Sequence, residues 1–347
     1  MGNDLIILEN SVATRPSDLP SAEIQEFADQ ARGYAALARS ANTRRAYAGD
    51  VRAFTTWCEA RGACPFPASP ATVLSYLIDH AGSALKVSTL RRRLIAIREW
   101  HVSSGHDLDT ASLGFRDAWV GIQREHGQPA VKKRPLMTIE LRRAVEILPD
   151  TLAGRRDRAL ILVGFAAALR RSELAALEVT RRDGVSWIEE RPDGLVIHLG
   201  RTKTDQQGAG AEVGVPYGSN PETCPVRNYR AWLKAARLKA GPAFRPVNRH
   251  GTLGKGAITG HAVARIVKRA VVAAALAEGD TPRQAERRAA AYAGHSLRSG
   301  LATSAAANDA PGHAIQRQLR HKRFDTTAGY IRSGQLFRQN AAGSAGL

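Results

Sequence analysis

The sequence predicts a mainly α-helical protein with a small β-hairpin or sheet, arranged as an all-helical N-terminal domain and a mixed α+β C-terminal domain. Apolar residues recur three or four positions apart along most of the chain, which is typical of helices. Only residues 195–199 and 213–215 alternate as a strand and its return partner do. A polar, basic stretch at 127–135 has no hydrophobic period, and we interpret it as a linker between residues 21–126 and 136–347.

The N-terminal domain is expected to contain only helices. Residues 1–20 lack a period and include Pro16 and Pro20, so we expect a flexible N-terminus. Capping Ser, Thr or Asn residues and closing glycines divide the rest into separate helices. These helices are expected at 21–39, at 42–62 with Asn42 or Thr43 as the cap, at 69–82, at 88–105 and at 111–125.

The C-terminal domain is expected to open with helices near 138–148 and 155–169. The hairpin follows, and Thr202-Lys203-Thr204 lies at its tip. Helices then dominate again to the end of the chain. One of them is expected to place four small apolar residues on a single face, namely Val263, Val267, Ala270 and Ala274.

The composition excludes several classes of protein. A hydrophobic content of 44% is too high for a disordered chain, and no apolar run is long enough to cross a bilayer or resembles a secretory leader. The net charge of +18, spread through a folded chain, predicts a polyanionic partner, and nucleic acid fits best. Cys58, Cys64 and Cys224 suit neither a metal site nor paired disulfides, so we expect reduced thiols and a cytoplasmic protein.

Four residues near the C-terminus have a spacing that suits attack on a phosphodiester. A His295-x-x-Arg298 motif is followed 23 residues later by His321, and Tyr330 comes nine residues after that. Arginine neutralises and orients a phosphate, histidine carries protons, and a tyrosine oxygen can attack phosphorus. Each residue type is common, so the spacing rather than any single residue indicates the chemistry.

Two upstream segments complete the set. A Leu-Arg-Arg-Ser-Glu-Leu run at 169–174 follows the apolar segment 159–169, so Arg170 lies where a buried helix leaves the core. Its neighbour Arg171 is an alternative candidate for an arginine that neutralises and orients the phosphate. Lys203, at the expected tip of the hairpin, can reach over a bound phosphate.

In this order, the motifs L-R-x-S-E-L, T-K-T on a hairpin, H-x-L-R and a later H before Y resemble those of the tyrosine recombinases, the phage integrase family. The resemblance is strong over residues 135–335. The helical N-terminal part is loosely similar to the core-binding domain of the simple, Cre-type two-domain members. Such proteins clamp DNA between their two domains.

The resemblance implies a site-specific DNA recombinase that cleaves and rejoins DNA through a 3′-phosphotyrosine intermediate and a Holliday junction. It implies no metal, no ATP and no other cofactor. The implied partner is double-stranded DNA with paired recombination sites, on which the protein assembles as a tetramer, without any membrane. The implied location is the bacterial cytoplasm, in association with the nucleoid.

By the same resemblance, Tyr330 is the nucleophile, and Arg170 and Arg298 clamp the non-bridging phosphate oxygens. A planar guanidinium suits two oxygens better than an ammonium does. The L-R-x-S-E-L register favours Arg170 over Arg171 for the first clamp.

Lys203 is implied to be the general acid for the departing 5′ oxygen, a role that suits a compact ammonium donor. His295 is implied to accept the tyrosine proton or to bind the phosphate, and His321 to donate to a non-bridging oxygen. Glu173 is expected to hold an arginine or a histidine in place.

Further basic residues are expected to bind DNA, although the bases they read cannot be inferred. The tail at 336–342 is amphipathic, and in this family such a tail docks into a neighbouring protomer; folding back onto its own domain is the alternative. The DNA-binding candidates are Arg44, Arg45, Arg52, Lys86, Arg91, Arg92, Arg93, Arg98, Arg265, Lys268 and Arg269.

Two other functions stay open at this point. A type IB topoisomerase-like or telomere-resolving enzyme shares the chemistry but differs in its outcome. A DNA-binding protein derived from a recombinase would bind without cleaving, and it would have no need of Tyr330.

Overall fold

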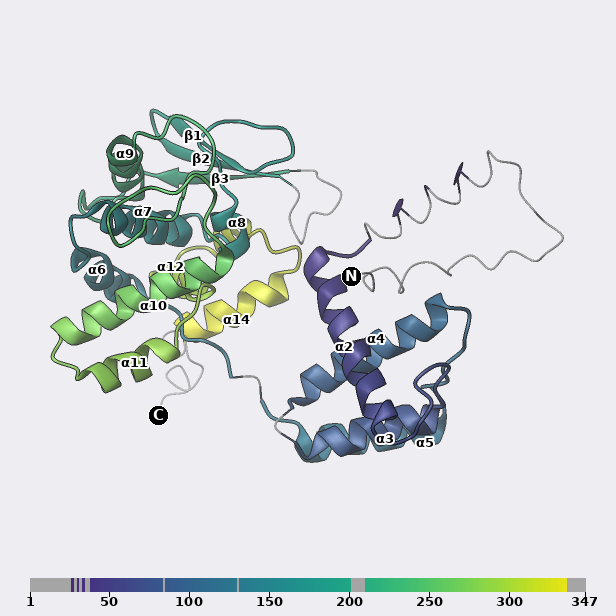
Figure 1. The fold of residues 1–347 in the computed structure, drawn as a ribbon. Helices are drawn as coiled ribbons and strands as arrows, with labels where there is room; N and C mark the ends of the chain where they lie inside the picture. Colours follow the sequence, from purple (N-terminus) through teal and green to yellow (C-terminus); the bar gives the residue numbers. More distant parts are fainter. Residues whose placement is uncertain are drawn as a thin grey trace. The chain divides into compact units, whose positions relative to one another are not determined.

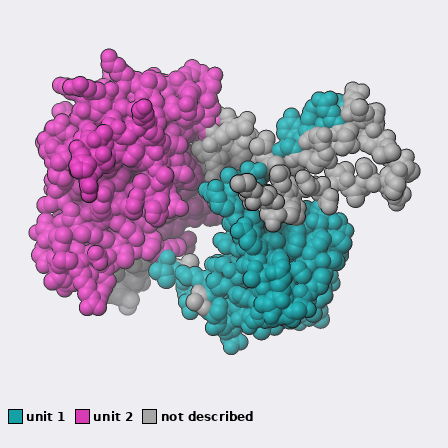
Figure 2. All heavy atoms as spheres, viewed as in Figure 1, with its two compact units in different colours: residues 1–131 teal, residues 132–347 magenta. Residues whose placement is uncertain are grey.

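The computed structural model describes residues 38–83, 85–129, 131–200 and 210–335, together with a few residues between 26 and 34. The expected helix at 21–39 therefore lies largely outside the described residues. Lys203 and the tail from residue 336 lie wholly outside them. The chain forms two compact units, residues 1–131 and 132–347, which are coloured separately in Figure 2.

The first unit is helical throughout its described part (Figure 1). Its core contains Phe54 and Tyr76, whose rings pack edge to face with their centroids 5.2 Å apart. The buried Leu77, Leu90 and Ile97 belong to the same core. The helices are α2 (Ala41–Glu59), α3 (Pro70–Ala81), α4 (Val87–Ser103) and α5 (Leu113–His126).

Two helix starts test the expected caps. Ser69 accepts the backbone N–H of Thr72 at 3.1 Å, as expected for the cap of α3. The expected cap of α2 at Asn42 or Thr43 is wrong, because Ser40 accepts the N–H of Thr43 at 3.2 Å and the helix begins at Ala41. An N-cap serine two or three residues upstream satisfies the same orphan donors, and the periodicity alone could not choose among them.

A buried histidine joins two parts of the first unit. The His101 Nε2 atom accepts the N–H of Ala68 at 2.8 Å, and its Nδ1–H donates to the carbonyl of Ile97 at 2.8 Å. The ring is fully buried, and loss of solvation lowers the pKa of His101 despite the bond to Ile97. Both contacts require the neutral imidazole with its proton on Nδ1.

The second unit is mainly helical, with a small antiparallel sheet at one side of the helices (Figure 1). Residues 133–136 belong to it, since the N–H groups of Arg134 and Leu136 donate to the carbonyls of Ala291 and Ser296, both at 2.9 Å. The helices are α6 (Thr138–Glu146), α7 (Leu152–Ala166), α8 (Arg171–Ala175), α9 (Pro225–Ala236), α10 (Gly260–Ala277), α11 (Pro282–Ala290), α12 (Ser296–Ala307), α13 (Gly312–Leu319) and α14 (Phe324–Gly334).

The sheet has the order β1 (Trp187–Arg191), β2 (Gly194–Leu199), β3 (Ala211–Pro216). The expected hairpin is confirmed, with Ile197 opposite Val213 in the register. β1 was not expected from the sequence, because among its five residues only Ile188 is buried, so it shows no alternation.

The sequence-based fold class is confirmed, since the described chain is mainly helical with one small sheet. α7 is buried on nearly every side and forms the centre of the second unit, while Val263, Val267, Ala270 and Ala274 of α10 share a buried face as expected. Within the described ranges, no helix is both long and apolar enough to cross a membrane.

We predict that His101→Phe lowers the free energy of unfolding by about 1–3 kcal/mol at pH 7.5, because it leaves the buried Ala68 N–H and Ile97 carbonyl unpaired. Urea unfolding of the full chain followed by circular dichroism measures this. The matched control is His106→Phe, an exposed histidine of the same unit, which should change stability by less than about 0.5 kcal/mol.

The same contact makes the stability depend on pH. The folded-state pKa of His101 lies below its unfolded value of 6.5, so the stabilisation is complete above pH 6.5. It declines as pH falls through 6.5 toward the folded-state pKa, because only the unfolded chain takes up the proton. The difference in the free energy of unfolding between wild type and His101→Phe should therefore become smaller as pH falls. A constant difference from pH 7.5 to 5 would argue against the neutral tautomer.

Candidate active site

Helix ends place the candidate catalytic side chains within one unit. Arg170 caps α8 directly after α7, and His295 caps α12, whose first turn carries Arg298. His321 follows α13, and Tyr330 lies in the middle of α14. α12 packs against both α7 and α14, so side chains far apart in the sequence meet at one place.

Close backbone approach fixes α12 and α14 against their neighbours. A Cβ on Gly300 of α12 would lie 2.0 Å from the carbonyl oxygen of Leu136, so only glycine fits there. A Cβ on Gly334 would lie 2.7 Å from the carbonyl oxygen of Thr303. Between these points a small apolar cluster supports Tyr330, formed by Ala168, Ala302, Ala306, Ile315 and Leu319.

Tyr330 is in hydrogen-bond contact with His295. The tyrosine hydroxyl lies 3.1 Å from His295 Nε2. The surface of His295 is exposed to solvent, but the surrounding protein removes part of its hydration, and this loss of solvation lowers its pKa. The positive charges of Arg298 and Arg170 lower the pKa further. A neutral imidazole can accept the tyrosine proton through Nε2.

His321 lies on another side of the same tyrosine, with the two rings 6.0 Å apart and nearly parallel. Burial first, then Arg298 and the other nearby cations, lower the pKa of His321 to about 4. Its Nδ1 lies 2.9 Å from Oγ1 of the buried Thr327. With Thr327 as donor to Nδ1, the ring proton is on Nε2, where it can be donated to a phosphate.

No motif in the sequence singled out Thr327. Its one available signal was its position three residues before Tyr330, which places both on one side of α14.

Arg298 is 1% exposed and is held by backbone carbonyls. Nη1 donates to Ala168 at 2.7 Å, and Nη2 donates to Leu319. Ala168 has a left-handed backbone, with φ of 48°, at the turn after α7. Burial first, then Arg320 and Arg170, lower the pKa of Arg298 to about 10, so the guanidinium stays charged at neutral pH.

Arg170 is bound by Glu173 at the start of α8. Its Nη1 donates to Glu173 Oε1 at 2.6 Å, and its backbone N–H donates to Oε2 at 2.9 Å. Burial alone would raise the pKa of Glu173, but Arg320 and then Arg170 lower it below its usual value. Arg171 is exposed, and its stem lies beside Gly294 and Gly260.

Arg320 joins this group although the sequence did not mark it. Its Nη2 donates to Glu173 Oε2 at 2.8 Å, so one carboxylate binds two arginines. The structure therefore brings together Arg170, Glu173, His295, Arg298, His321 and Tyr330, with Arg320 and Thr327 added.

The basic residues proposed for DNA lie mostly on exposed faces of α2, α4 and α10. Arg92 forms a two-point ion pair with the buried Asp50, at 2.7 and 2.9 Å. Arg93 is half-buried and donates to the Tyr76 hydroxyl at 2.5 Å. The exposed ones are Arg44, Arg45, Arg52, Lys86, Arg91, Arg92, Arg98, Arg265, Lys268 and Arg269.

Known proteins are similar to this chain along most of its length. Residues 34–103 match the phage integrase N-terminal SAM-like domain. An integrase/recombinase XerD homologue of Selenomonas ruminantium is 37% identical over 304 residues, which cover 86% of this chain and 84% of that protein.

Two solved structures share the fold. One is the XerH site-specific recombinase bound to a palindromic difH substrate, with a TM-score of 0.57 and 16% identity over 86% of this chain and 78% of that one. The other is the Tn1549 transposon integrase with transposon right end DNA, with a TM-score of 0.57 and 15% identity over 92% and 98% of the two chains.

The order and spacing of the motifs, the mainly helical fold and the identity to the Selenomonas protein all agree. The identity extends across most of both chains, so it covers both units of this protein. The chain belongs to the tyrosine recombinase (phage integrase) family and is a site-specific recombinase that cleaves and rejoins DNA.

Proposed function

We propose that the protein exchanges strands between two DNA sites through a 3′-phosphotyrosine and a Holliday junction, with Tyr330 as the nucleophile. The observation that carries this proposal is the Tyr330 hydroxyl at 3.1 Å from His295 Nε2, beside a group of buried arginines. A tyrosine with a neutral acceptor and a cationic surround suits attack on a phosphodiester.

In the proposed cleavage step, the Tyr330 oxygen forms a bond to the scissile phosphorus as the bond from phosphorus to the 5′ oxygen breaks. The tyrosine proton passes to His295. Lys203, outside the described residues, protonates the departing 5′ oxygen. The number of phosphate ester bonds is unchanged, because the bond to tyrosine replaces the bond to the 5′ oxygen, so the reverse attack by a 5′-hydroxyl rejoins DNA without ATP.

Arg170 and Arg298 would bind the non-bridging oxygens, where negative charge grows in the transition state. His321 would add a donor from Nε2, since its Nδ1 faces Thr327. Three arginines in and around this site supply the positive charge that metal ions supply in many other phosphoryl-transfer sites, so the mechanism we propose uses no metal.

We further propose that the exposed basic faces of α2, α4 and α10 bind the DNA backbone and the base edges. The net charge of +18 supports this, and binding should weaken steeply with added salt. Asp50 holds the edge of the Arg92 guanidinium formed by Nε and Nη2, so the opposite edge would meet DNA in a fixed orientation. The cysteines are free thiols, which suits the bacterial cytoplasm and the nucleoid.

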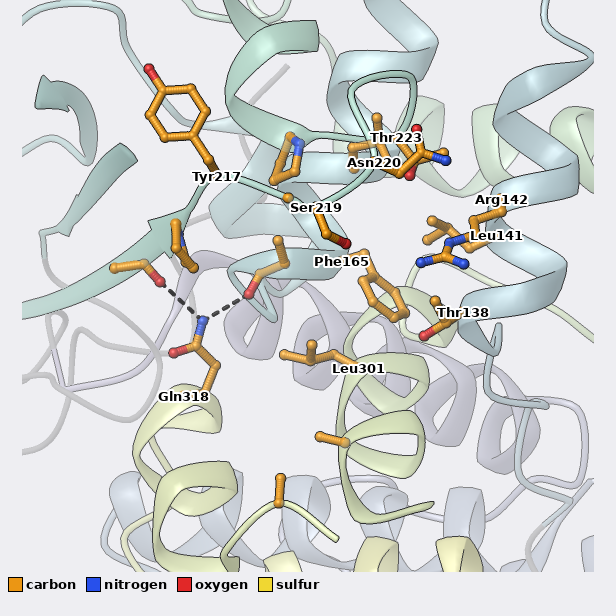
Figure 3. A pocket seen from close by; sticks show the side chains of 18 of the residues that line it. Thr138, Leu141, Arg142, Phe165, Tyr217, Ser219, Asn220, Thr223, Leu301 and Gln318 are labelled. Atoms are coloured by element: carbon orange, nitrogen blue, oxygen red, sulfur yellow. Dashed lines mark hydrogen bonds between the residues drawn. The ribbon is translucent and has the colours of Figure 1, made fainter. Parts of the chain in front are cut away.

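A pocket of about 460 Å³ in the catalytic unit is a candidate surface for self-association (Figure 3). Its lining is largely apolar, with Phe165 and Leu301 beside Ala314 and Ile315, and polar side chains such as Asn220 lie at its edge. We propose that the amphipathic segment after Gln335 of a neighbouring copy docks here. Such a head-to-tail contact can close into a ring, as a tetramer on two DNA sites requires.

We predict that Tyr330→Phe abolishes the covalent protein–DNA adduct and leaves DNA affinity within about threefold, because only the attacking oxygen is removed. The assay uses nicked duplexes from DNA flanking the gene, trapped and separated on a denaturing gel. An adduct formed by Tyr330→Phe would show that another nucleophile is in use. Tight binding by wild type with no adduct on any fragment would favour a DNA-binding protein that does not cleave.

The pH dependence of cleavage should reflect the lowered pKa of His295. Its neutral form is the proton acceptor, so cleavage is lost only as pH falls below the usual histidine range of about 6.5. The second-order rate constant for adduct formation, measured from pH 5 to 8, should stay level down to about 6.5. A decline that begins above pH 7 would contradict this assignment, and His295→Gln should remove the acidic limb.

Removing residues 336–347 should abolish pairing of two DNA sites and leave adduct formation on a single site, because the active site is complete without them. Ala314→Trp, which fills the pocket, should have the same effect; His313→Trp, exposed on the same helix, should have none. Native gels with two labelled sites measure pairing. Normal pairing by both altered proteins would exclude this pocket as the acceptor.

A further inference from the structure

The residue before His321 has a backbone conformation that disfavours it. Arg320 ends α13 with φ of 55° and ψ of 42°, in the left-handed region. Its N–H donates to the carbonyls of Gln316 and Arg317, which is a common way to close a helix. Glycine has no Cβ to crowd the next carbonyl there, so it is the usual residue. A glycine would adopt this conformation with less strain, but it would lack the contact with Glu173 that the Arg320 side chain makes.

The Arg320 side chain is almost buried and bridges three segments. It is 11% exposed, and Nη2 donates to Glu173 Oε2 at 2.8 Å. The same guanidinium donates to the carbonyls of Ala167, Ala168 and Gln318 at 3.2 to 3.3 Å. It therefore ties the end of α7 and the start of α8 to the turn that carries His321.

The contact with Glu173 changes the charge that Arg170 can offer. Glu173 carries one negative charge and binds Arg170 through Oε1 and Arg320 through Oε2. With Arg320 present, the net charge of this group is +2, from the three positive charges of Arg170, Arg298 and Arg320 and the one negative charge of Glu173. Without Arg320 the carboxylate would be paired by Arg170 alone, and the net charge would fall to +1.

The contact with Ala168 reaches the second clamp. The Ala168 carbonyl accepts both Arg320 Nη2, at 3.3 Å, and Arg298 Nη1, at 2.7 Å. Arg320 thus supports the carbonyl that orients Arg298, and it orients the carboxylate that holds Arg170. Both proposed phosphate clamps depend on contacts that Arg320 shares.

We propose that Arg320 is a positioning residue for cleavage: it neutralises and fixes Glu173 so that Arg170 and Arg298 face the scissile phosphate with their full charge. This inference rests on the proposed function of Tyr330 and the two clamps. Arg320 itself touches no reacting atom. Its effect should therefore appear in the rate of cleavage rather than in DNA affinity.

The chain contains a matched control for the backbone. Arg237 ends α9 with φ of 52° and ψ of 39°, the same conformation as Arg320, and its described contacts are backbone hydrogen bonds only. Arg237→Gly and Arg320→Gly both relieve a left-handed non-glycine residue. Only Arg320→Gly removes a side chain that contacts Glu173.

The experiment measures adduct formation by the full-length protein under single-turnover conditions, on the nicked duplex that wild type cleaves. We expect Arg320→Gly to slow cleavage about tenfold or more, with DNA affinity and melting temperature near those of Arg237→Gly. Arg320→Lys keeps the charge and should recover part of the rate. A methylphosphonate at the scissile position is neutral and carries one negative charge fewer than the phosphodiester. On this substrate the ratio of the cleavage rates of wild type and Arg320→Gly should therefore be smaller.

Equal cleavage rates for Arg320→Gly and Arg237→Gly would overturn the proposal. So would a parallel loss of DNA affinity and thermal stability in Arg320→Gly, or the same ratio of rates on phosphodiester and methylphosphonate, because each indicates a structural role. If wild type forms no Tyr330-dependent adduct on DNA that it binds, the proposed function itself fails, and this proposal fails with it.

Discussion

The candidate active site depends on one carboxylate, that of Glu173, which holds two arginines together in a nearly buried place. Arg170 and Arg320 both bind Glu173, and the mutual repulsion of the cations is visible in the lowered pKa values of Arg298 and Arg320, for which burial is the larger cause. Backbone carbonyls from the ends of α7 and α13 supply the remaining acceptors. The positive charge is thus fixed in direction before any phosphate arrives, and little reorganisation is left for the reaction itself.

The same cations set the protonation of the two histidines. Arg298 and Arg170 contribute to lowering the pKa of both His295 and His321, after burial. Both rings are therefore neutral at pH 7, which gives His295 a free lone pair toward Tyr330 and gives His321 a single proton to direct. In the proposed mechanism, a bound phosphate would offset part of the positive field and raise the pKa of His295, which would make it a stronger acceptor for the Tyr330 proton.

Periodicity predicted the helices of the first unit, α6, α7 and α10, and the hairpin, and motif spacing singled out Arg170, Glu173, His295, Arg298, His321 and Tyr330, because these features repeat locally or follow one another along the chain. They could not predict β1, in which only Ile188 is buried. They also missed Arg320 and Thr327, whose importance comes from partners brought close by folding: Glu173 lies 147 residues from Arg320. Arg92 shows the same limit, since its sequence suggested only a basic face, while Asp50 on another helix fixes its direction.

Two of the left-handed non-glycine residues of the second unit lie where the arginines attach. Ala168 and Arg320 are both left-handed and lie at the ends of α7 and α13, and a carbonyl at each of these turns, from Ala168 and Leu319, accepts a bond from Arg298. Ordinary helix ends would direct those carbonyls along the helix axis, away from a side chain that arrives from α12. The turns place them around the guanidinium instead, and the apolar cluster of Ala168, Ala302, Ala306, Ile315 and Leu319 packs closely enough to hold that geometry. The small residues in this cluster are therefore part of how the site is oriented, although none of them carries a charge.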